Sequence, residues 1–244
     1  MRYSALGAVF CTFLLAAGEK LLFDFRGSNV QTAPPIAPEA RQNLLSAAFP
    51  HYLADEKECQ AQEPPSEATL EAARKKGQIV PEVMSRVAGA FIRPGAREQA
   101  YLIKVGECSA PSRSYFGTYR LAVFENGRLI ASGPSSGGDH IDAVKDVDGD
   151  GVDEILISGC AFGQGVEECS ARLLSLAGGP VRTVQDFPEV YSDTCGSTRD
   201  SGIRASVIRF APGHPPEFFA EEYQAACPKP GQKPKFEFSA ERRF

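Results

Sequence analysis

The sequence has no tryptophan, only three histidines, and no series of apolar segments of the kind that a polytopic membrane protein needs. It also has no phosphate-binding loop, no dinucleotide fingerprint and no N-x-S/T sequon. The net charge of −5 argues against nucleic acid as a partner. A chain of 244 residues with 43% hydrophobic and 23% charged residues is not disordered, and its length suits one medium domain or two small ones.

The N-terminus has the pattern of an export signal. Met1–Ser4 carries a positive charge, and residues 5–17 form an uncharged, mainly apolar run. This run has the length of a signal-peptide core and is too short for a comfortable membrane span. Cleavage after Ala17 or Gly18 would give a secreted or periplasmic protein without a stable membrane span. The alternative is an uncleaved anchor, which residues 21–23 would extend.

The cysteines fit an exported protein. Outside the apolar run there are six, and they form no C-x-x-C motif and have no histidine at zinc-finger spacing. An even number of cysteines in an oxidising compartment predicts disulfides. The short spacing favours a Cys160–Cys169 bridge, and elimination leaves Cys195–Cys227 and Cys59–Cys108.

Local composition divides the chain into zones. Prolines at 34, 35 and 38 indicate a linker before a helix that begins at Pro38 and ends before Pro50. A second short helix is expected after Pro64-Pro65, and the basic, proline-containing end is expected to be mobile. The predicted organisation is a signal peptide at 1–18, a linker at 19–37, a helical part at 38–78, a β domain at 79–227 and a mobile tail at 228–244.

The β domain contains two similar stretches. The strand-like segments 101–103 and 120–124 are matched, 52 to 54 residues later, by 155–157 and 172–176. Each second segment leads into a glycine-containing turn, and a further short strand follows; Asn126-Gly127 is a strong hairpin signal. A partial third copy covers 204–223. A period near 50 residues with about four strands per unit is typical of propeller blades, whereas chance similarity between hairpins of a sandwich is the alternative. The predicted fold class is mainly β, α+β overall, with antiparallel sheets like degenerate blades.

One acidic loop has the pattern of a metal-binding site. The segment 146–154 reads DVDGDGVDE, with carboxylates at its first, third and fifth positions and glycine at the sixth. Such a loop wraps around a hard cation, and Ca²⁺ takes six to eight oxygen ligands. From Asp139 to Glu154 the seven acidic residues and one lysine carry a net charge of −6, so an empty loop is repulsive.

The loop resembles the calcium loop of FG-GAP repeats, the integrin α-like or VCBS type, rather than an EF-hand, because strands and not helices flank it. The resemblance implies a Ca²⁺ cofactor held by side chains at loop positions 1, 3, 5 and 9 and by the carbonyl at position 7. It leaves open whether Asp153 or Glu154 closes the site. The upstream copy at 90–98 is read as having lost its carboxylates, so it should not bind metal. The candidate metal ligands are Asp146, Asp148, Asp150, Val152 (by its carbonyl), Asp153 and Glu154.

A second motif suggests a different function, that of a serine hydrolase. Residues 133–137 fit G-x-S-x-G around Ser135, with Asp139 and His140 just beyond. A nucleophile elbow needs a helix after the serine, and the sequence predicts a strand. We therefore expect a non-catalytic, exported calcium-binding module for binding or surface interaction, with another envelope or extracellular protein as a possible partner. A secreted hydrolase and a cell-envelope structural subunit are the alternatives.

Overall fold

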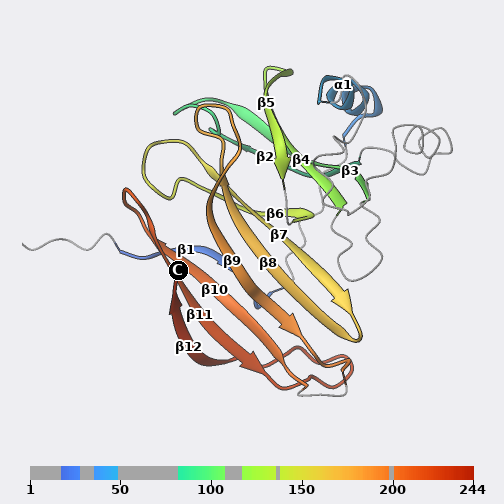
Figure 1. Cartoon of the computed structure of the whole chain (residues 1–244), viewed down its shortest axis with the longest axis vertical. Helices are drawn as coiled ribbons and strands as arrows, with labels where there is room; N and C mark the ends of the chain where they lie inside the picture. The colour runs from blue at the N-terminus through green and yellow to red at the C-terminus, as the bar shows by residue number, and fades with distance from the viewer. Residues whose placement is uncertain (1–17, 28–35, 49–81, 108–116, 136–137, 198–200) are drawn as a thin grey trace, which may run out of the picture.

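The structure is a computed structural model that describes residues 18–27, 36–48, 82–107, 117–135, 138–197 and 201–244. Two antiparallel sheets that do not close on themselves make up most of it (Figure 1). The smaller sheet is a four-stranded meander of β2 (Glu82–Gly89), β3 (Glu98–Glu107), β4 (Gly117–Glu125) and β5 (Arg128–Ser135).

The larger sheet has eight strands. Seven follow the spatial order β12-β11-β10-β9-β8-β7-β6, and β1 pairs with β10 off this path. Their bounds are β1 (Lys20–Asp24), β6 (His140–Lys145), β7 (Glu154–Gly163), β8 (Val166–Ser175), β9 (Arg182–Asp193), β10 (Ile203–Ala211), β11 (Glu217–Ala225) and β12 (Glu237–Arg243).

The expected antiparallel strands are confirmed, and the hairpin signal is correct. Asn126 and Gly127 have φ angles of 51° and 77°, and the register pairs Glu125 with Arg128 across the turn. Positive φ at both central residues is what a tight hairpin needs to match the twist of its strands. The predicted first helix is also present as α1 (Pro38–Ala48), whereas the expected second helix lies outside the described residues.

Strands with apolar residues on both faces explain the layered packing. In β3, Leu102 faces a core that both sheets share, while Tyr101 and Ile103 face α1, which lies beside the small sheet (Figure 1). Successive side chains of a strand point to opposite faces, so a continuous apolar run must be covered twice. In β7, Ile155 faces the shared core. Leu156 faces a second core on the other side of the strand, to which residues of β1 and β9–β11 also contribute.

Three expectations need correction. Residues 20–24 of the expected linker form β1, because Leu22 is 3% exposed and packs into the core of the large sheet. Residues 237–243 of the expected mobile tail form β12, which pairs with β11 from Phe219 to Gln224. The partial third copy, β10 and β11, extends the second meander's sheet instead of forming a separate blade.

Two of the three expected disulfides are present. Cys160–Cys169 joins directly paired residues of β7 and β8, and Cys195–Cys227 links the loop after β9 to the loop after β11. Cys59 and Cys108, like the signal-peptide segment 1–17, lie outside the described residues. The two bridges are consistent with an extracellular or periplasmic protein. Among the residues described, no helix is long and apolar enough to cross a membrane.

Candidate metal centre

The acidic loop and its upstream counterpart occupy equivalent places in the two meanders. Residues 90–97 connect β2 to β3, and residues 146–153 connect β6 to β7. Their sixth positions, Gly95 and Gly151, have φ angles of 70° and 83°, a region that glycine adopts without strain. The same backbone reversal is therefore built twice, once with carboxylates and once without.

A buried glutamate organises each loop. Glu98 and Glu154, which directly follow the two loops as the first residues of β3 and β7, are 1% and 3% exposed. Glu98 Oε2 accepts hydrogen bonds from the backbone N–H groups of Phe91 (2.6 Å) and Ile92 (2.9 Å), and Glu154 Oε2 accepts one from Val147 N–H (3.2 Å). Sequence reasoning treated Glu154 only as a possible ligand and did not assign this structural role to either residue.

Three of the candidate ligands converge. One carboxylate oxygen from each of Asp146, Asp148 and Glu154 lies within 4.8 Å of the others, and this cluster could hold a metal ion. Three hard oxygen donors of this kind suit a divalent cation such as Ca²⁺. The other grouping, Cys160, Glu167 and Cys169, is not comparable, because its two sulfurs are joined in a disulfide.

Backbone amides hold the aspartates in place. Asp146 accepts hydrogen bonds from the N–H groups of Gly149 (2.7 Å) and Gly151 (3.1 Å). Asp148 accepts from Asp150 N–H (3.2 Å), and Asp150 accepts from Val152 N–H (2.7 Å). These bonds orient the side chains of the loop before any ion binds.

Asp153 makes a different contact, with the upstream loop. Its Oδ2 accepts a hydrogen bond from Ala90 N–H (2.8 Å), and its own N–H donates to the Ala90 carbonyl (2.6 Å). Both bonds connect the acidic loop to the start of the upstream loop. Asp153 thus links the two sheets, while Glu154 joins Asp146 and Asp148.

The different contacts of Asp153 and Glu154 predict separate effects on stability and on calcium binding. Asp153→Ala should lower the free energy of unfolding by about 1–2 kcal/mol, because the Ala90 amide loses its acceptor in a half-buried position. The calcium-induced rise in melting temperature should remain. Thermal melting with chelator and then with Ca²⁺ checks both statements, and loss of the calcium response in this variant would show that Asp153 is a ligand.

The surroundings of Glu154 favour a bound cation. Burial raises the pKa of Glu154 to about 7, the negative charge of Asp148 adds to this shift, and hydrogen bonds from Val147 N–H and with Ser175 oppose it. A cation would offset both the burial and the repulsion. A cavity of about 330 Å³ borders the cluster and is lined by Asp148, Glu154, Arg182 and His214.

The hydrolase motif does not form a nucleophile elbow. Ser135 ends β5 and is 3% exposed, and the next element in the described chain is strand β6, not a helix. His140 instead contacts the Asp139 carboxylate through Nδ1 and Ser158 Oγ through Nε2 (3.0 Å). Ser158 lies within β7 and is only 2% exposed, so a substrate cannot reach its hydroxyl in this structure.

His140 and its carboxylates predict a pH effect. Burial raises the pKa of Asp142 to about 6, and the hydrogen bond to Asp139, helped by the charge of Asp142, raises the pKa of His140. Both groups bind protons more tightly in the folded state than when unfolded. With chelator present, stability should therefore fall as the pH rises from about 4 to 6 for Asp142, from about 4.5 to 7 for Glu154, and above about 6.5 for His140.

Asp142→Asn tests this directly. The neutral amide should stabilise the fold at pH 7 by about 2 kcal/mol and change it little at pH 4. Urea unfolding between pH 4 and 8 measures the slope, which should flatten in the variant. A wild-type slope in Asp142→Asn would mean that other groups control the pH response.

The fold and the loop together define a two-sheet, antiparallel β protein with a loop-borne carboxylate cluster suited to a metal ion. The chain matches no protein-family model, no curated protein and no solved structure in comparisons with each.

Proposed function

We propose that this protein is an exported, non-catalytic module that binds Ca²⁺ in the loop 146–154. The observation that carries the proposal is the convergence of Asp146, Asp148 and Glu154 in a loop that its own backbone amides preorganise. Hard carboxylate oxygens and a glycine-permitted reversal favour Ca²⁺ over softer metals. Asp150 and the Val152 carbonyl would complete the coordination shell.

The loop's position in the fold supports a structural role for the ion. The acidic loop connects β6 to β7 and contacts the upstream loop through Asp153 and Ala90. A bound cation would therefore stiffen the junction between the two meanders. In this proposal the meanders are degenerate FG-GAP-type blades, a relation that the two equivalent loops with Gly95 and Gly151 support.

The module would serve a binding or surface role outside the cytoplasm. Disulfides and the sequence of the N-terminus support the location, and the buried Ser158 and Ser135 favour a non-catalytic role over a hydrolase. Calorimetric titration of chelator-treated protein with Ca²⁺ is the direct test. One site per chain is expected, and it should be absent in Asp148→Ala; no heat in the wild type would reject the proposal.

A further inference from the structure

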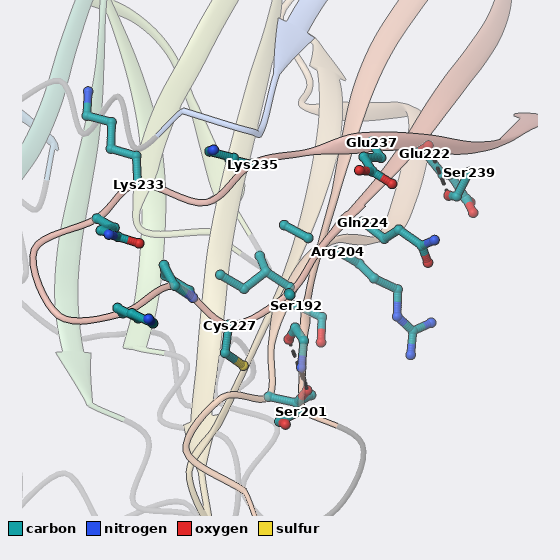
Figure 2. Close-up of a pocket in the computed structure, with 18 residues that line it drawn as sticks. Ser192, Ser201, Arg204, Glu222, Gln224, Cys227, Lys233, Lys235, Glu237 and Ser239 are labelled. Atoms are coloured by element: carbon teal, nitrogen blue, oxygen red, sulfur yellow. Dashed lines mark hydrogen bonds between the residues drawn. The ribbon is translucent and has the colours of Figure 1, made fainter.

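A second concave site lies at the far end of the large sheet, where β9 and β11 end and β10 begins (Figure 2). Its volume is about 1050 Å³, just above the roughly 300–1,000 Å³ typical of ligand pockets. Residues 226–236, which connect β11 to β12, form one wall. This size suits a ligand of several connected units rather than a single small ion.

The two sides of this cavity are held together. Cys227 lines it and is bonded to Cys195, so a disulfide fixes the wall to the loop after β9. Thr194 N–H donates to the Gly202 carbonyl (3.0 Å), and Gly202 N–H donates to Thr194 Oγ1 (3.0 Å). A cavity with such fixed walls loses little conformational entropy when a ligand binds.

The charge of the cavity contrasts with that of the protein. Four cationic side chains line it, although the whole chain carries −5: Arg204, Lys229, Lys233 and Lys235. Within the described part of the chain, none of these four has an ion-pair partner. All four are exposed, so an anionic ligand can reach them and is attracted by their charge.

The opposite side has a different character. In Figure 2, Lys233 and Lys235 lie on one side, and Glu222, Glu237 and Ser239 lie on the other. Glu222 is ion-paired with Arg242 (3.2 Å), whereas Glu237 has no ion pair among the described residues. Carboxylates accept hydrogen bonds from hydroxyl groups, and Ser and Gln side chains can both donate and accept. An anionic sugar has hydroxyl groups that can donate to these carboxylates as well as charges for the lysines, whereas an acidic peptide offers only the charges.

We propose that this cavity binds an anionic oligosaccharide, with Lys229, Lys233 and Lys235 facing its carboxylate or sulfate groups. The glutamates, with Ser192, Gln224 and Ser239, would bind its hydroxyl groups. The inference is independent of the calcium loop, so every measurement can be made in chelator.

Four fluorescently labelled probes of similar length test the proposal: oligogalacturonate, a sulfated oligosaccharide, a neutral glucan and an oligoglutamate. Binding of each is measured by fluorescence anisotropy at a fixed ionic strength. The wild type should bind one of the two anionic sugars and neither the glucan nor the peptide; which sugar binds tighter identifies the anion. Changing Lys229, Lys233 and Lys235 together to Gln should weaken binding about tenfold or more.

A matched variant controls for bulk charge. Exposed Lys20, Arg97 and Arg128 lie outside the cavity, and changing them to Gln removes the same total charge. This control should keep its affinity within about twofold, and melting curves should show both variants folded. Equal weakening in the two variants, tighter binding of oligoglutamate, or no binding of either anionic sugar would overturn the proposal.

Discussion

Adding Ca²⁺ to the chelator-treated protein is expected to raise its melting temperature by about 5–10 °C. Only the folded loop brings Asp146, Asp148 and Glu154 together, so the free energy of binding adds to the free energy of unfolding. At free calcium about 100 times the dissociation constant, the gain is about 2.7 kcal/mol. For a domain of this size that corresponds to the stated shift.

Two comparisons make this result specific. Mg²⁺ should stabilise the protein less, because it gives up its water reluctantly and needs a tighter octahedron. Asp148→Ala should remove the calcium effect while it leaves Gly149 and Gly151 to form the turn. Differential scanning calorimetry with chelator, Mg²⁺ and Ca²⁺ provides the measurement, and an unchanged wild-type melting temperature would mean that the loop is only an acidic turn.

The largest effect of a single substitution is expected at Glu98, far from any candidate metal ligand in sequence. Glu98→Ala should lower the free energy of unfolding by about 3 kcal/mol. Its carboxylate is buried and accepts two backbone hydrogen bonds, from Phe91 and Ile92, so truncation leaves two amides without an acceptor. Urea denaturation in chelator measures the loss.

Conservative variants then separate loop architecture from metal binding. Glu98→Gln keeps an oxygen that can accept from the two amides, so most of the stability should return, and the calcium response should equal that of the wild type. Glu154→Gln also keeps an acceptor for Val147 N–H but removes a charged ligand, so it should fold without metal and lose calcium affinity. Wild-type stability in Glu98→Ala would show that the hydrogen bonds to this carboxylate do not matter.

Local signals were sufficient for much of the fold. The Asn126-Gly127 turn, the apolar segments of β3 and β7 and the proline that limits α1 are each signals of a few neighbouring residues, so they can be read from the sequence. The short β1 was missed because its residues follow the apolar N-terminal run and resemble its continuation. The strand β12 was missed because lysines and prolines precede it, and its pairing with β11 is visible only in three dimensions.

The candidate site, too, could be predicted only as far as neighbouring residues in the sequence allow. The acidic spacing predicted a metal loop, but it could not separate Asp153 from Glu154, which are neighbours in sequence. In extended backbone, adjacent side chains point in opposite directions, and which one faces the aspartates depends on the upstream loop. The bond from Ala90 N–H to Asp153 decides this, and it connects residues that are 63 positions apart. The cationic cavity could not be predicted from the sequence for a similar reason, because segments at the ends of β9, β10 and β11, which are far apart in the chain, form it.

The pairing of β1 with β10 has a consequence for the order of folding. Lys20 lies opposite Phe210, and Asp24 lies opposite Val207, so one of the first strands to be synthesised must wait for one of the last. Contacts of such long sequence separation form slowly, because a large loop has to close before they are gained. A chain still attached to the ribosome would therefore lack its completed large sheet until β10 has been synthesised.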